Sequence, residues 1–90
     1  MHVRKILIYP SFTKEFRKLD PALQERTMKA HALFRGNPLH PSLRLHLLKG
    51  KLQGLGSVSV TMGVRIIFQR MENGDIVFLS VGKHDLYRSW

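Results

Sequence analysis

Apolar residues at the start of the chain form a strand pattern and then a helix pattern. Residues 3–9 (VRKILIY) are β-branched and aromatic and end at a proline, which predicts a strand. Ser11 follows as a predicted helix cap. Phe12, Phe16 and Leu19 then recur at i, i+4 and i+7 and therefore share one face of the predicted helix.

A second helix is predicted directly after the first. Asp20-Pro21 closes the first helix and opens the next, because aspartate caps a helix and proline suits its first position. Gly36-Asn37-Pro38 ends it. Its predicted inner stripe consists of Leu23, Thr27, Ala30 and Phe34.

The second half of the chain has strand patterns. Residues 37–42 read as a loop, and residues 43–48 as a short edge strand or irregular structure. From residue 57 to 62 serine and threonine alternate with Val58, Val60 and Met62, which predicts a strand with one face on the core and one face open. A strand over residues 64–70 comes next, then a type I′ turn at Asn73-Gly74, then residues 76–81 (IVFLSV), which are apolar on both faces and so predicted central.

Together these elements predict an α+β fold in the order β-α-α-β-β-β. We expect an antiparallel sheet with two helices packed on one face. The chain has 90 residues, of which 43% are hydrophobic, so it has enough apolar surface for one core and is too short for two. Residues 1–90 are therefore expected to form a single domain.

The charge balance favours an anionic partner. Fifteen Lys and Arg residues against six Asp and Glu give a formal net charge of +9, so nucleic acid, a membrane surface or an acidic protein are the candidates. No apolar run approaches the roughly 18 residues of a membrane span, so we expect a soluble, cytoplasmic protein that is not exported. The absence of cysteine excludes disulfides and a thiolate nucleophile.

A few polar residues have the chemistry of a site. Arg65 lies within a predicted strand, where it either pairs with a surface acid or directs its guanidinium at a phosphate. His84 follows the last strand beside Asp85, which suits a general acid or base, although it could also serve structurally. His2, His31 and His40 are expected to be exposed and without a catalytic role. A metal site formed by His46 and His84 has no supporting ligand spacing, so we expect no metal or other cofactor.

Five segments follow one another along the chain in a recognisable order. They are Ser11-Phe12 with Phe16-Arg17-Lys18-Leu19, residues 37–44 (NPLHPSLR), residues 46–50 (HLLKG), residues 64–68 (VRIIF) and residues 81–87 (VGKHDLY). Together they resemble the RelE/ParE superfamily of toxins from toxin–antitoxin modules, most closely the RelE and YafQ type. The resemblance spans nearly the whole chain and agrees with the predicted order of elements.

The resemblance implies a ribosome-dependent mRNA endonuclease of a type II module, metal-independent and held inactive by a cognate antitoxin. It implies that Arg65 contacts the scissile phosphate and that His84 is the general acid. His46 or Tyr87 would orient or deprotonate the 2′-OH. RNA-binding roles are expected for the cations around these residues, namely Arg44, Lys49, Lys51, Lys83 and Arg88.

One strand departs from the RelE and YafQ patterns. RelE places lysines on the strand that here reads Ser57-Val58-Ser59-Val60-Thr61, and YafQ places acids and a histidine there. This difference leaves the general base open. Two other functions also remain, a ParE-like toxin that inhibits DNA gyrase without catalysis and a plain RNA- or ribosome-binding module.

Overall fold

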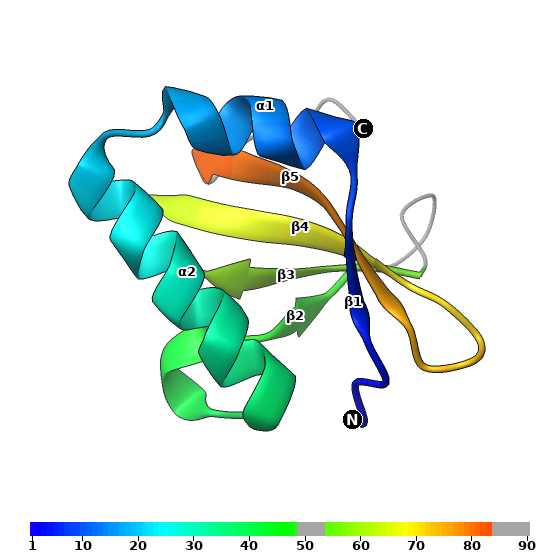
Figure 1. Ribbon diagram of the computed structural model, residues 1–90. Coiled ribbons are helices and arrows are strands. Elements are labelled where there is room, and N and C mark those ends of the chain that lie inside the picture. Colours follow the sequence, from blue (N-terminus) through cyan, green and yellow to red (C-terminus); the bar gives the residue numbers. More distant parts are fainter. Residues whose placement is uncertain (49–53, 84–90) are drawn as a thin grey trace.

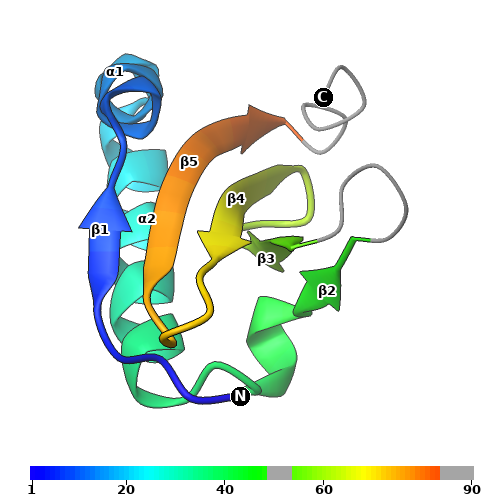
Figure 2. The ribbon, with the colours of Figure 1, turned by 90° about the vertical axis from the view of Figure 1, so that its right-hand side faces the viewer.

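Two helices cover one face of a five-stranded sheet (Figures 1 and 2). The structure is a computed structural model and describes residues 1–48 and 54–83. The predicted α+β fold and its order of elements are confirmed. The elements are β1 (Ile6–Ile8), α1 (Pro10–Lys18), α2 (Pro21–Gly36), a 3-10 helix η1 (Pro41–Leu43), β2 (His46–Leu47), β3 (Leu55–Ser59), β4 (Val64–Arg70) and β5 (Ile76–Lys83).

The sheet is mixed rather than wholly antiparallel. Its strand order is β1-β5-β4-β3-β2, and β1 lies parallel to β5, with Ile6 opposite Ile76. The other three pairings are antiparallel. A hydrophobic pattern carries no information on strand direction, and everything between β1 and β5 forms the crossover that a parallel pair requires.

The core lies between the helices and the sheet. Phe34 on α2 is fully buried against Phe68 on β4 and Phe78 on β5, with ring centroids 5.2 and 5.9 Å away. The predicted helix faces are confirmed, because Phe12 and Ala30 are buried in the same cluster. Val58 and Val60 also face this core as predicted. Met62 does not, because the strand ends at Ser59 and leaves that side chain 87% exposed.

Strand β1 pairs with β5 only as far as Phe78, and helix α1 covers the edge of β5 after that point. The hydroxyl of Ser11 donates to the backbone oxygen of Leu79, and Glu15 Oε1 accepts from Ser80 Oγ at 2.6 Å and from the Val81 N–H at 3.4 Å. The prediction that Ser11 caps α1 is therefore wrong, since the helix begins at Pro10 and Ser11 lies inside it. By contrast, Asp20 caps α2 as predicted, accepting from the Leu23 N–H at 2.9 Å.

The hairpin between β4 and β5 is not of type I′. Gly74 has a φ of 93°, but Asn73 lacks the positive φ that a type I′ turn requires. The Gly74 N–H instead donates to the Met71 oxygen at 3.1 Å. Asp75 beside it is 6% exposed and forms a two-bond ion pair with Arg4 at 2.8 and 3.2 Å, which ties the N-terminal segment to the hairpin.

Among the helices described, none is long and apolar enough to cross a membrane.

Candidate functional site

Polar residues from three neighbouring strands meet on the sheet face that the helices leave open. His46 on β2 lies directly opposite Ser57 on β3, and Ser59 lies opposite Arg65 on β4. Successive side chains of a strand point to opposite faces. Because Val58 and Ile66 point into the core under the helices, Ser57 and Arg65 project from the other face.

A hydrogen bond joins the arginine to the serine. Arg65 Nη1 donates to Ser57 Oγ at 3.0 Å. Ser57 is 1% exposed, whereas Arg65 is half-buried and His46 is exposed. The buried hydroxyl therefore holds one edge of a guanidinium that still reaches solvent, beside an imidazole that solvent also reaches.

This arrangement favours binding of an anion. A guanidinium carries five N–H donors in a planar fork, and Ser57 accepts from one of them. The ion pairs within residues 1–48 and 54–83 are Arg4 with Asp75 and Lys29 with Glu25, so Arg65 does not pair with an acid there. The donors on the exposed side of Arg65 match the geometry of a phosphate.

Two further predicted residues lie at the ends of these strands. Lys83 is the exposed last residue of β5 and lies opposite Val64, and its neighbour Gly82 lies opposite Arg65. Arg44 is exposed just before β2, in the left-handed conformation with φ 46° and ψ 52°. The remaining predicted site residues, His84, Tyr87, Lys49, Lys51 and Arg88, lie outside the described residues.

Sequence reasoning missed the role of Ser57. The alternation around Val58 does place Ser57 on the outer face, but it also predicts that this face is open, and Ser57 is buried. The hydrogen bond to Arg65 depends on the register of β3 against β4, which the strand pattern alone does not specify.

Within the described residues no group of three or more His, Asp or Glu side chains could hold a metal ion.

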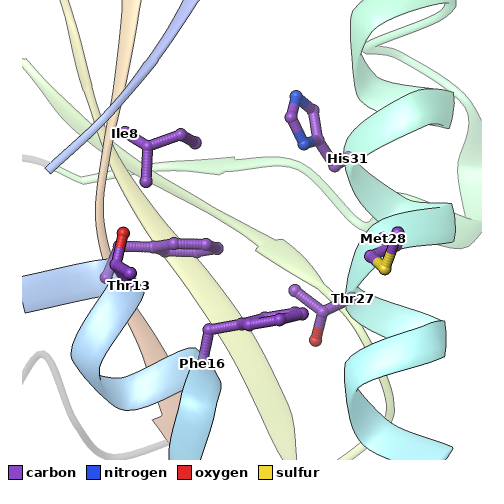
Figure 3. A pocket seen from close by; sticks show the side chains of 7 residues that line it. Ile8, Thr13, Phe16, Thr27, Met28 and His31 are labelled. Carbon is purple, nitrogen blue, oxygen red and sulfur yellow. The ribbon is translucent and has the colours of Figure 1, made fainter.

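A separate apolar groove of about 280 Å³ lies on the helical side of the molecule. Figure 3 shows Phe16 from α1, Met28 and His31 from α2, and Ile8 from β1 around this space. His31 is half-buried with its ring 5.2 Å from that of Phe78, so its predicted exposure is wrong. Burial, together with the nearby charge of Arg35, lowers the pKa of His31. These apolar walls make the groove unsuitable for phosphate.

Solved structures of several toxins have the same fold as this chain. YafQ from E. coli is 18% identical, with a TM-score of 0.72 over 91% of this chain and 94% of YafQ. The YoeB/ParE toxin from Agrobacterium tumefaciens is 16% identical, with a TM-score of 0.73 over 89% and 98% of the two chains. The toxin–antitoxin complex RelBE2 from Mycobacterium tuberculosis gives 20% identity and a TM-score of 0.61 over 89% and 96%.

No family model matches the chain, and no curated protein matches its sequence. The chain thus has the RelE-like toxin fold. At these sequence identities the likeness shows a shared fold and does not show a shared activity.

Proposed function

We propose that this chain is the toxin of a type II toxin–antitoxin module and that it cuts mRNA on the ribosome. The observation that carries the proposal is the cluster of Arg65, Ser57 and His46 on the sheet face that the helices do not cover. The RelE-like fold and the net charge of +9 support it, because an RNA substrate supplies the anionic partner that such a charge favours.

The proposed reaction needs three groups around one phosphodiester. A base removes the proton of the 2′-OH, whose oxygen attacks phosphorus. The bond from phosphorus to the 5′-oxygen then breaks as an acid protonates that oxygen. The products are a 2′,3′-cyclic phosphate and a 5′-hydroxyl. Arg65 stabilises the charge added in the transition state, as a fixed guanidinium does without reorganisation at the moment of reaction.

The acid and the base are assigned by the resemblance of the sequence. His84 is the proposed acid, and it comes directly after Lys83, the last described residue of β5. His46 or Tyr87 is the proposed base or orienting group. His46 is the better supported of the two, because it lies opposite the serine that holds Arg65.

RNA binding is proposed for the cations around this cluster, and the ribosome would hold the message in line for attack. They are Arg44, Lys49, Lys51, Lys83 and Arg88. Phosphate contacts by such residues make binding weaken steeply with salt. The proposed inhibitor is a cognate antitoxin with an acidic segment that covers the basic surface as a helix or an added strand.

The test compares Arg65→Ala with Arg70→Ala, which removes an exposed arginine from the hairpin end of the same strand. Each variant is expressed under tight control, and the 5′ ends of cellular mRNA are mapped. Wild type and Arg70→Ala should arrest growth and leave cuts in phase with codons, whereas Arg65→Ala should leave the message intact. An equal result for the two arginine variants would contradict the proposal.

The other functions give different outcomes in the same experiment. Growth arrest with intact message and double-strand DNA breaks would indicate a gyrase inhibitor. Binding to ribosomes without cuts or arrest would indicate a plain binding module. A message with a 2′-deoxy nucleotide at the cut position should resist the wild-type protein, because the attacking hydroxyl is missing.

A further inference from the structure

A second pocket lies on the edge of the molecule between α2, η1 and the end of β3. Its volume is about 240 Å³. Arg26 and Lys29, one turn apart on α2, lie at its rim, and both are exposed.

The floor of this pocket is apolar. Leu43 is 1% exposed and Val60 8% exposed, and half-buried Leu33 completes the surface. A pocket with an apolar floor and a few charged groups at one side binds a ligand that has a flat or apolar part and an anionic part. An inorganic anion alone would leave the floor uncovered.

Both rim cations are available to a ligand. The ion pair between Lys29 and Glu25 spans 3.4 Å between side chains that are 75% and 70% exposed, and such surface pairs contribute little. Arg26 forms no ion pair within residues 1–48 and 54–83. The exposed Ser42 adds a hydroxyl at the same rim, where its oxygen lies 2.8 Å from His40 Nδ1.

The pocket adjoins the candidate site through β3. Ser59 lines it and lies opposite Arg65 in the sheet register. The pocket lies on the helix side of the sheet and Arg65 projects from the other face, so a single RNA strand that passes around the end of β3 would contact both. The volume lies below the roughly 300 to 1,000 Å³ of pockets for drug-sized ligands and fits one base rather than a peptide helix.

We infer that this pocket binds one nucleotide of the RNA, with its base over Leu33, Leu43 and Val60 and its phosphate between Arg26 and Lys29. The inference rests on the proposed function for its choice of RNA. It adds a subsite that fixes the position of the strand relative to Arg65. Single-stranded RNA is read in this way, by bases that leave the stack and enter protein pockets.

The test measures binding of a short RNA whose 2′-hydroxyls are all methylated, so that it cannot be cut. The double variant Arg26→Ala/Lys29→Ala is compared with Arg17→Ala/Lys18→Ala, which removes the same charge from exposed positions of α1. Affinity should fall about tenfold further for the first than for the second, and the salt dependence should decrease by about one unit of slope for each lost contact. Equal losses would overturn the inference, because general electrostatic attraction would then explain the binding.

A second pair of variants keeps all the basic residues. Ser42→Glu places a negative charge at the rim, and Met62→Glu places one on an 87% exposed side chain elsewhere. Both variants add one negative charge, so Ser42→Glu should weaken RNA binding more than Met62→Glu does. In methyl spectra of the wild type, uridine monophosphate should shift Leu33 and Leu43, and inorganic phosphate alone should not.

Two further outcomes would overturn the subsite. Shifts produced equally by phosphate would show that no base is bound. Displacement of the RNA from the pocket by a polyglutamate peptide, with stronger shifts at Leu33 and Leu43 than any nucleotide gives, would indicate a protein partner. Loss of cleavage in Arg65→Ala is independent of all these results, so the subsite and the proposed function can fail separately.

Discussion

Arg65 donates a 3.0 Å hydrogen bond to a serine that is almost fully buried, Ser57 on the neighbouring strand. A buried hydroxyl cannot contact a substrate, so Ser57 is a positioning residue. It fixes the rotamer of a long side chain that would otherwise sample many conformations in solvent. On β3, where the RelE and YafQ patterns have charged residues, the proposed endonuclease thus has a serine that holds Arg65 of β4 in place.

Replacing Ser57 with alanine should lower kcat about tenfold with little change in KM, because Arg65 acts mainly on charge that develops in the transition state. The measurement is cleavage of mRNA on purified ribosomes. Ser11→Ala is the control, because it removes a hydroxyl that donates to the backbone oxygen of Leu79 and is not bonded to Arg65. A change in KM alone for Ser57→Ala would contradict a positioning role.

Because Gly56 has no side chain, the ring of Phe68 can occupy the space beside it in the core. A Cβ at Gly56 would lie 2.4 Å from Cζ of Phe68, whose ring is fully buried and cannot move away. Gly56→Ala should therefore lower the free energy of unfolding by about 1 to 3 kcal/mol, the usual cost of overpacking. Urea denaturation measures the change.

Gly63→Ala provides the control, since a Cβ there would meet nothing within 4 Å. Its unfolding midpoint should lie close to that of the wild type. If the two alanine variants were equally stable, the ring of Phe68 would not occupy the space above Gly56.

Local spacing was sufficient to predict the helices. The i, i+4 and i+7 positions of Phe12, Phe16 and Leu19 and the cap at Asp20 involve residues within two turns of one another, so the sequence shows them directly. The predicted order of strands along the chain is confirmed for the same reason.

What the sequence could not show depends on distant partners. Ser11 looks like a helix cap until β5 is placed beside α1, where its hydroxyl reaches the oxygen of Leu79. The direction of β1 is likewise set by its pairing with residues 70 positions further along the chain, as Ile6 opposite Ile76 illustrates. At the candidate site, the residue type of Arg65 and its place in a strand make it a candidate for binding phosphate. Its hydrogen bond to Ser57 could not be predicted without the register of β3 against β4.

Arg44 carries backbone strain that a functional side chain would explain. Its φ of 46° lies in the left-handed region, which costs a residue with a Cβ roughly 1 to 2 kcal/mol and costs glycine almost nothing. Arg44→Gly and Arg44→Ala both remove the guanidinium, so they should weaken RNA binding equally. Arg44→Gly should nevertheless be the more stable of the two by about 1 kcal/mol, after the entropy of glycine in the unfolded chain is included.

Thermal or urea unfolding of the two variants checks the strain, and binding of the methylated RNA checks the function. An alanine variant as stable as the glycine variant would contradict the strained backbone. An unchanged affinity in both would remove Arg44 from the RNA-binding surface.

The ion pair of Arg4 with Asp75 predicts how stability depends on acid. The hydrogen bonds from Arg4 hold the pKa of Asp75 below its ordinary value, although burial acts in the opposite direction. The unfolded chain therefore binds a proton at Asp75 at a higher pH than the folded chain does. The stabilisation from this pair is complete above the unfolded pKa of roughly 3.9 and is lost as the pH falls through the lower folded pKa.

Arg4→Met should remove this contribution, so the acid unfolding midpoint should move to higher pH and the gain in stability between acid and neutral pH should shrink. Lys29→Met removes the same charge from an exposed pair with Glu25 and should shift the midpoint much less. Circular dichroism followed from neutral to acid pH measures both midpoints. Equal shifts of the two midpoints would mean that net charge, rather than the contact between Arg4 and Asp75, sets the acid stability. The N-terminal segment would then be joined to the hairpin chiefly by backbone hydrogen bonds, such as that from the Arg4 N–H to the Gly74 oxygen at 2.9 Å.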